Sequence, residues 1–330
     1  MQQPMKEKAG RIMGNSKRAT IKTIAEEANV TSNTVSLALR DSPLVKKETK
    51  ALILEIAARQ GYVPNIMAES LRLGYSKLIA LVFSDIGNPL FSIKTKKIEA
   101  ALRSQGYQVM IMDTNNDLEQ EKDVIRSAIG RKVDGVVLSP CQKGRDALDM
   151  LAQYKIPCVL VGRSFEDNLE DSVIWDNYSG GKLATEYLLS RGCRRILCLL
   201  GPKELSTTYE RKYGYMAALK DAGIEADDEL MCEADVEMVR AVIEKKQGLF
   251  DGVFAFNDPI AWNAAVCLES RVPIIGYDNV KSTISMPFSL PTIGADLDSE
   301  TRYIVDLLLK RIGEFDRPTS KIVLPVEVVI

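Results

Sequence analysis

The sequence predicts an α/β protein with a small helical domain at its N-terminus and a larger body of two doubly wound parallel sheets. Residues 20–39 have the pattern of two short amphipathic helices joined by a tight turn, and from residue 78 onward apolar strand-like runs alternate with helical stretches. The chain of 330 residues also exceeds the ~250–300 residues at which a single core stops growing. We therefore expect two or three domains.

The first helix follows residues 1–19, a basic tail that we expect to be disordered. Thr20 is a candidate N-cap, because its hydroxyl can accept a backbone N–H of the first turn. One face of the helix is apolar and consists of Ile21, Ile24, Ala25 and Ala28. The chain must then reverse, and Asn29 is one of the few non-glycine residues that tolerate a left-handed backbone at such a turn.

The second helix can be capped by Thr31 or Ser32, and its inward face consists of Val35, Ala38 and Leu39. Its outward face near the N-terminus is small, polar and uncharged, and this is the part of a helix-turn-helix that meets base edges in DNA. The candidate DNA-contacting residues are Thr20, Ser32, Asn33, Thr34, Ser36 and Leu37. Leu37 either contacts a thymine methyl group or is an ordinary surface leucine.

A third helix completes the headpiece, which we place at residues 20–63. It is predicted to end at Gly61 as a C-cap. Its apolar positions at helical spacing are Leu44, Val45, Leu52, Ile53, Ile56 and Ala57. The alternative is an ordinary three-helix bundle that never touches DNA.

Charge is distributed unevenly along the chain, and this favours the DNA-binding interpretation. Residues 1–74 contain 12 Lys and Arg against 7 Asp and Glu, whereas the other 256 residues contain 31 against 38. A modest basic head on an acidic body suits a DNA-binding module carried by a domain with a different task. Because few phosphate contacts per head give weak binding, we expect site-specific binding by a dimer.

Composition excludes several other classes of protein. Histidine is absent, and the six cysteines contain no Cys-x-x-Cys pair, so we expect buried free thiols, no metal site and no cofactor. The chain has neither a nucleophile elbow nor a phosphate-binding loop, and we expect no enzyme activity. No apolar run approaches ~18 residues and no secretory signal is visible, so we expect a cytoplasmic protein without membrane contact.

Residues 64–76 are predicted to form a hinge between headpiece and body. Pro64 and Asn65 open about two turns of helix, which is too short to be stable alone in water. Such a segment is ordered only when something packs against it. The hinge is therefore a candidate switch.

Several motifs in the same order resemble the lactose/galactose repressor (LacI/GalR) family of bacterial transcription regulators, over residues 20–330. They are the helix-turn-helix, Gly61-Tyr62-Val63-Pro64-Asn65, the segment Asp85–Phe91 and Gly276-Tyr277-Asp278. The resemblance implies a body like that of periplasmic sugar-binding proteins, with a ligand cleft between two subdomains and crossover segments near 162, 292 and 321. It implies an N-terminal subdomain of residues 77–162 plus 293–321 and a C-terminal subdomain of residues 163–292 plus 322–330.

In the body, loops at the predicted strand ends carry the polar groups that a small hydroxylated ligand needs. The candidate effector-binding residues are Asn88, Phe91, Arg163, Asp176, Thr207, Arg211, Asn257, Asp258 and Asp278. By resemblance, Arg211 and Asp278 contact the ligand, and Thr207 and Asp176 touch or support it. Alternatively, Asp176 and Asp258 cap the helices that follow them, and Arg163 forms an ion pair that closes the domains. This set of groups fits a sugar-like ligand.

The resemblance further implies a homodimer that places two headpieces on a near-palindromic double-stranded operator and two hinge helices in the minor groove between them. The hinge candidates are Asn65, Ala68 and Leu71. Leu71 is either a wedge that kinks the duplex or a leucine packed on the body. Leu37 stands where many members carry arginine, so we expect the operator to differ from the common one. The chain lacks a leucine heptad tail, so we expect a dimer and not a coiled-coil tetramer.

These features predict a transcriptional regulator, most simply a repressor, controlled by a sugar or sugar derivative. Two alternatives stay open. One is a repressor that needs a purine as corepressor, and the other is a solute-binding protein without DNA function.

Overall fold

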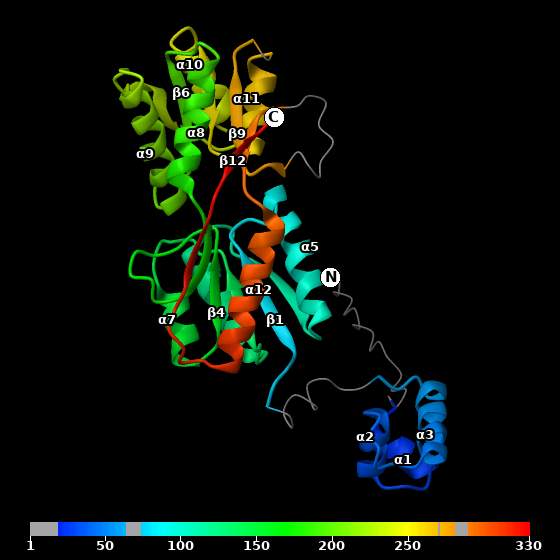
Figure 1. Cartoon of the computed structure of the whole chain (residues 1–330). Helices are drawn as coiled ribbons and strands as arrows, with labels where there is room; N and C mark the ends of the chain where they lie inside the picture. Colours follow the sequence, from blue (N-terminus) through cyan, green and yellow to red (C-terminus); the bar gives the residue numbers. More distant parts are fainter. Residues whose placement is uncertain (1–18, 64–73, 270, 281–289) are drawn as a thin grey trace, which may run out of the picture. The chain divides into compact units, whose positions relative to one another are not determined.

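The computed structural model describes residues 19–63, 74–269, 271–280 and 290–330, and it divides the chain into two compact units that meet between Arg72 and Leu73. The predicted tail and the hinge candidates Asn65, Ala68 and Leu71 lie outside the described residues. Figure 1 shows the course of the chain and the element labels used below.

The first unit contains the predicted three-helix headpiece, with α1 at Ile21–Glu27, α2 at Ser32–Leu39 and α3 at Lys47–Arg59. Thr20 caps α1, since its hydroxyl accepts the Thr23 N–H while the Thr23 hydroxyl accepts the Thr20 N–H. Asn29 has the left-handed backbone that the turn requires, with φ 51°, and the Thr31 hydroxyl accepts the Thr34 N–H at the start of α2. Sequence-local hydrogen bonds therefore fix the helix-turn-helix.

Three apolar positions of the headpiece differ from the prediction. Leu44 lies before α3 and is 82% exposed, and Leu52 is 46% exposed, because the inward face of α3 is formed by Ile53, Ile56 and Ala57. Leu37, predicted to face outward, is half-buried and packs against the headpiece core. The Leu37 side chain therefore contributes to the packing of the headpiece.

The lower lobe of the body in Figure 1 is built on a parallel sheet in the order β11-β5-β4-β3-β1-β2. Its strands are β1 (Leu78–Phe83), β2 (Gln108–Asp113), β3 (Gly135–Leu138), β4 (Cys158–Val161), β5 (Asp171–Trp175) and β11 (Lys321–Leu324). Its helices are α5 (Pro89–Ser104), α6 (Leu118–Gly130), α7 (Asp146–Gln153) and α12 (Leu297–Gly313). We call this the N-lobe.

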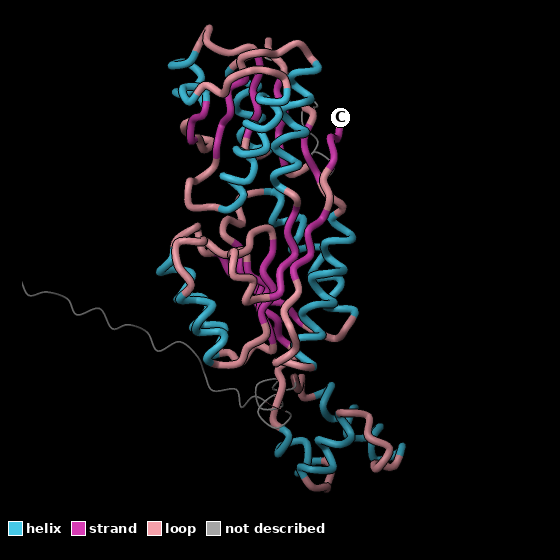
Figure 2. The backbone as a smooth tube through the Cα atoms, turned by 60° about the vertical axis from the view of Figure 1, so that its left-hand side comes forward, coloured by secondary structure: helices cyan, strands magenta, loops and turns pink. Residues whose placement is uncertain are grey.

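The upper lobe, the C-lobe, has the strand order β12-β10-β9-β8-β6-β7, in which only the β10–β12 pair is antiparallel. Its strands are β6 (Ile196–Leu200), β7 (Met231–Glu233), β8 (Gly252–Ala255), β9 (Ile274–Tyr277), β10 (Thr292–Gly294) and β12 (Glu327–Val329). Its helices are α8 (Asn177–Ser190), α9 (Ser206–Asp221), a short 3-10 turn (Asp228–Leu230), α10 (Val239–Lys246) and α11 (Asp258–Cys267). Figure 2 shows strands lying between layers of helices in both lobes.

The chain passes between the lobes later than predicted. The first passage lies between β5 and α8, and not near residue 162, because β5 pairs with β4 and extends the N-lobe sheet. The other two lie between β10 and α12 and between β11 and β12, which corrects the boundaries at 293 and 321. Strand β5 begins with Asp171, whose buried carboxylate is neutralised by Arg311 and Arg317, so the strand is not a purely apolar run in the sequence.

Helices α8 and α9 pack closely because glycines stand at their contact. A β-carbon on Gly181 would collide with the backbone carbonyl of Arg211, and one on Gly214 would collide with the carbonyl of Tyr178. Any larger side chain at Gly181 or Gly214 would therefore separate the two helices that carry Asn177 and Arg211.

Candidate functional site

The exposed surface of the headpiece at the N-terminus of α2 carries Ser32 and Asn33, as predicted for a recognition helix. Thr34 and Ser36 are only partly exposed, and the Thr34 hydroxyl is hydrogen-bonded to that of Thr31 at 2.9 Å. The sequence analysis missed Arg40, an exposed cation whose Nε donates to the Ser36 carbonyl at 3.0 Å and whose Nη2 donates to the Ser36 hydroxyl at 3.2 Å. The sequence did offer a signal for Arg40, namely a basic residue one helical turn after Ser36.

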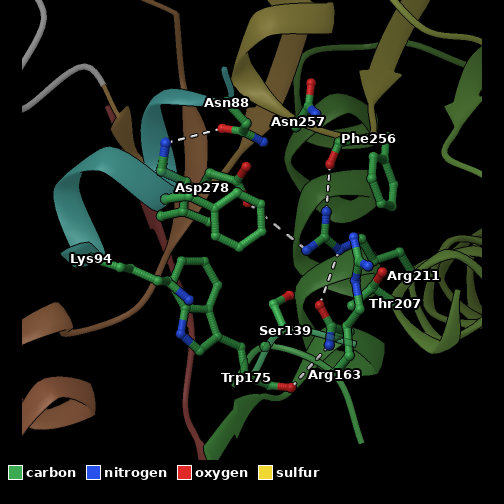
Figure 3. Close-up of a pocket in the computed structure, with 14 residues that line it drawn as sticks. Asn88, Lys94, Ser139, Arg163, Trp175, Thr207, Arg211, Phe256, Asn257 and Asp278 are labelled. Atoms are coloured by element: carbon green, nitrogen blue, oxygen red, sulfur yellow. Dashed lines mark hydrogen bonds and ion pairs between the residues drawn. The ribbon is translucent and has the colours of Figure 1, made fainter. Parts of the chain in front are cut away.

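A polar pocket lies between the two lobes of the body, at the ends of their strands (Figure 3). An inner cavity of about 70 Å³ adjoins a larger one of about 410 Å³. The inner cavity is lined by Asn88, Leu90, Phe91, Lys94, Ser139, Gly162, Arg163, Trp175, Asn177, Thr207, Arg211, Phe256, Asn257 and Asp278. Asn88, Phe91, Arg163, Phe256 and Asn257 line both cavities.

Arg211 is the most connected residue of the pocket. Helix α9 presents its guanidinium, whose Nε donates to Asn177 Oδ1 at 3.0 Å and whose Nη1 donates to the Phe256 carbonyl. Its Nη2 lies 3.9 Å from Asp278 Oδ1. The guanidinium also lies over the rings of Tyr277 and Phe256, 3.5 and 4.6 Å from their centroids. These contacts hold the fork of Arg211 in one orientation.

Asp278 contacts groups from both lobes. It follows β9 in the C-lobe, and it shares a hydrogen bond with the Asn88 amide of the N-lobe. Burial raises the pKa of Asp278 to about 6, against the opposing effect of Arg211 and Lys94. Asp278 also has φ 103°, a conformation that side chains rarely adopt and that tends to occur at functional sites.

We expect the pH dependence of stability to change when Asp278 is replaced by asparagine. The folded-state pKa of about 6 lies above the ordinary value of 3.8, so the folded state holds this proton more tightly than the unfolded state. Between pH 7 and pH 5 the unfolding free energy of the wild type should rise by about 1 kcal/mol relative to D278N. Urea unfolding at both pH values measures this difference, and parallel changes in the two proteins would assign the titration to another group.

A buried charged network lies beside the pocket. Lys94 Nζ of α5 is 2.8 Å from Glu300 Oε1 of α12, and the indole N–H of Trp175 donates to the same oxygen at 3.0 Å. The Lys94 and Glu300 side chains are 4% and 1% exposed, and the ammonium lies 4.8 Å from the Trp175 ring centroid. Lys94 is therefore already neutralised within the protein.

Two predicted effector residues do not line the inner cavity. Asp176 caps α8, where its carboxylate accepts the N–H and hydroxyl of Ser179. Asp258 is buried and accepts the Thr292 hydroxyl at 2.6 Å and the Val280 N–H at 2.9 Å. Asp176 therefore caps the helix that follows it, as the alternative interpretation had it. Asp258 does not, because α11 is capped by the Asn257 side chain, which accepts the Ile260 N–H at 3.0 Å.

The structure brings the other predicted effector residues together, and it adds side chains that sequence reasoning missed. Asn88, Phe91, Arg163, Thr207, Arg211, Asn257 and Asp278 share the inner cavity. The residues missed are Leu90, Lys94, Ser139, Trp175 and Phe256. Trp175 and Phe256 could have been found by looking for ligand-binding residues at strand ends, since each stands at or just beyond the end of a strand. Arg163 does not form the ion pair that was its alternative role, because no carboxylate of the described residues lies within 4 Å of it.

Known protein families match both units of the chain. Residues 20–65 match the model for "Bacterial regulatory proteins, lacI family", and residues 76–293 match that for "Periplasmic binding proteins and sugar binding domain of LacI family". The chain belongs to the LacI family.

Relatives and solved structures agree with this assignment. The LacI-family chain is 29% identical to the HTH-type transcriptional repressor PurR of Vibrio atlanticus (strain LGP32), over 90% of this chain and 93% of the relative. It matches the transcriptional regulator CelR in a cellobiose complex with a TM-score of 0.69 and 25% identity, over 95% of this chain and 99% of that one. The lac repressor dimer bound to operator and the anti-inducer ONPF shares the fold, with a TM-score of 0.81 and 21% identity over 95% and 98% of the two chains.

This LacI-family protein is therefore a DNA-binding repressor with a ligand-binding body. Its relatives are transcriptional regulators and not enzymes. No helix of the described residues combines the length and the apolar character needed to cross a bilayer. The same residues contain no cluster of three acidic or cysteine side chains suited to a metal ion.

Proposed function

We propose that this repressor changes its operator affinity when a sugar or sugar derivative binds between the two lobes. The observation that carries the proposal is that Asp278 interacts with both Arg211 of the C-lobe and Asn88 of the N-lobe. Hydrogen-bond donors and acceptors from the two lobes thus meet at one cavity. A ligand that contacts these groups alters the relation between the lobes. Coupling of ~1–3 kcal/mol suffices to change operator affinity 5- to 150-fold.

The chemistry of the pocket supports a hydroxylated ring as ligand. Amide, carboxylate and guanidinium groups provide directional hydrogen bonds, while Phe91, Trp175 and Phe256 offer aromatic faces for the ring. The related CelR structure holds cellobiose. A purine corepressor is the second candidate, favoured by the similarity to PurR.

On the DNA side, we propose that two copies of the chain bind a near-palindromic operator in the cytoplasm. Ser32 and Asn33 would face the major groove, because they lie exposed at the start of α2, and the partly exposed Ser36 would follow them one turn along the helix. Residues 64–76 would form the hinge, with Asn65, Ala68 and Leu71 at the minor groove and Leu71 as the wedge. For the body, we propose lobe boundaries at the three observed passages.

A gel-shift assay with palindromic operators, combined with a thermal-shift screen, tests the function. We expect operator binding at low salt and a ligand that both raises Tm and changes the gel shift; a ligand at ~100 times its Kd stabilises by ~2.7 kcal/mol. Sugars and hypoxanthine, screened in parallel, decide between the two effector classes. Absence of specific binding to any such palindrome would refute the repressor function.

Replacing Arg211 by lysine should nearly eliminate the ligand-induced thermal shift. Lysine keeps the charge but cannot donate from a planar fork to Asn177, Phe256 and a ligand at once. We expect ligand affinity to fall about 10- to 100-fold, which corresponds to losing a charged hydrogen bond. The control is R240K, an exposed change on α10 of the same lobe. An undiminished shift in R211K would move the ligand to another site.

A further inference from the structure

Three cations line the inner cavity, and they differ in how their charges are balanced. Lys94 is paired with the buried carboxylate of Glu300 at 2.8 Å. Arg211 is paired with Asp278, although at the longer distance of 3.9 Å. Arg163 has no carboxylate within 4 Å among the described residues. Of the three cations that line the cavity, Arg163 is therefore the one that no nearby carboxylate of the described residues neutralises.

The guanidinium of Arg163 keeps donors for another partner. Arg163 is 9% exposed and lines both cavities. Its Nη1 donates to Asn116 Oδ1 at 3.0 Å and to the Pro140 carbonyl at 2.8 Å, both neutral acceptors. Within the described part of the chain, Nε and Nη2 have no hydrogen bond. A nine-tenths-buried guanidinium with unused donors beside a cavity has the geometry of an anion-binding group.

The charges around Arg163 favour the binding of an anion beside its guanidinium. Burial and, to a smaller extent, repulsion by the Arg211 guanidinium lower the pKa of Arg163 to about 10. Glu121 is the nearby buried carboxylate, but its Oε2 accepts the Cys141 N–H at 2.7 Å. Burial raises the pKa of Glu121. Asp278, the remaining carboxylate, is committed to Arg211 and Asn88.

The N-terminus of α9 adds a second, independent attraction for negative charge. Thr207, in the first turn of this 16-residue helix, lines the cavity next to Arg163 and Arg211 (Figure 3). Leu205 provides no side-chain cap there, and the Ser206 N–H is satisfied by Gln142 Oε1 of the N-lobe at 2.9 Å. The positive end of a helix dipole stabilises an anion placed within its first turn.

We propose that the effector carries an oxyanion, a carboxylate or a phosphate, which binds between Arg163 and Arg211 at the junction of the two cavities. The effector class is then a sugar acid or a sugar phosphate, and the larger cavity of about 410 Å³ accommodates the rest of the molecule. An anion at this position joins the N-lobe through Arg163 to the C-lobe through Arg211. The inference rests on the proposed function, whose ligand it specifies.

The test compares four probes with the full-length protein by thermal shift: inorganic phosphate, D-glucuronate, D-glucose 6-phosphate and D-glucose. Ionic strength is matched with sodium chloride, because salt screens exposed charges and does so less for buried ones. The variants are R163Q, which removes the charge, and R163K, which keeps it. The control is R131Q, which removes an exposed arginine from the same lobe.

We expect inorganic phosphate and at least one acidic sugar to raise Tm of the wild type and of R131Q above the sodium chloride reference, with D-glucose less effective. In R163Q the affinity for those anions should fall about 10- to 100-fold, and R163K should retain part of the response. Glucuronate and glucose 6-phosphate distinguish a carboxylate from a phosphate effector.

The proposal is overturned if none of the anions raises Tm above the chloride reference, or if R163Q responds as the wild type does. A gel shift on the same preparations separates this failure from a failure of the proposed function. Retained operator binding without any anion response removes the oxyanion inference alone. Loss of operator binding in the wild type removes the regulatory function itself.

Discussion

Lys94→Met is expected to lower the unfolding free energy of the body by about 3–5 kcal/mol, because it leaves a buried charge without its partner. Glu300 would keep only the indole N–H of Trp175 as a hydrogen-bond donor, and its side chain is 1% exposed. Methionine fills the space of the lysine stem, so the loss reports the charge and not a cavity. Urea unfolding of the full-length protein, followed by a signal from the body, measures the change.

Two further variants make this result specific. K94M/E300Q should recover most of the lost stability, since the glutamine carbonyl accepts the Trp175 N–H without carrying a charge. K97M removes a cation one turn along the same helix, where the pair with Asp298 is partly exposed, and should change stability by less than about 1 kcal/mol. A small effect of K94M, or no recovery in the double variant, would contradict the importance of the buried pair.

Ile53→Ala is expected to abolish operator binding while leaving the body folded. Ile53 is completely buried in the headpiece core, and such a truncation costs about 2–5 kcal/mol. A domain of this size rarely has more than about 3–5 kcal/mol from its core. The substitution should therefore unfold the headpiece, which forms a compact unit separate from the body. A gel shift measures DNA binding, and the ligand-induced thermal shift reports the body.

Leu52→Ala is the matched control, since it removes the same kind of side chain one position earlier in α3. Leu52 is 46% exposed, and such surface changes usually stay within about 0.5 kcal/mol. Operator binding should survive in L52A. Equal loss in both variants would mean that α3 contacts DNA through Leu52 or that the headpiece core is arranged differently.

Local patterns predicted most of the fold, because the main helices and strands of each lobe depend on short-range periodicity and on turn residues such as Asn29 and Gly61. Elements whose stability depends on distant partners are harder to predict from local pattern. Strand β5 is an example, since it begins with a buried aspartate that is neutralised by Arg311 and Arg317. Such a pairing spans 140 residues and leaves no local signal.

The same distinction applies to the pocket. Polar residues just beyond strand ends were found because the topology of open α/β sheets places them together. Lys94 was missed because it lies on an amphipathic helix, where a lysine ordinarily faces solvent. Its partner Glu300 lies 206 residues further along the chain. Leu37 was assigned outward from its position on α2, but the headpiece is small enough that even this flank of the helix packs against the core.

The glycine contact between α8 and α9 limits how the C-lobe can respond to a ligand. With Gly181 against the Arg211 carbonyl and Gly214 against that of Tyr178, these helices cannot slide past each other without a backbone collision. Asn177 and Arg211 therefore move together as one stiff unit. A ligand that binds Arg211, as we propose, would displace the C-lobe as a whole, and the resulting rotation would be taken up by the three connecting segments between the lobes. Substitutions in those connectors would tune the strength of the response without altering what the pocket recognises.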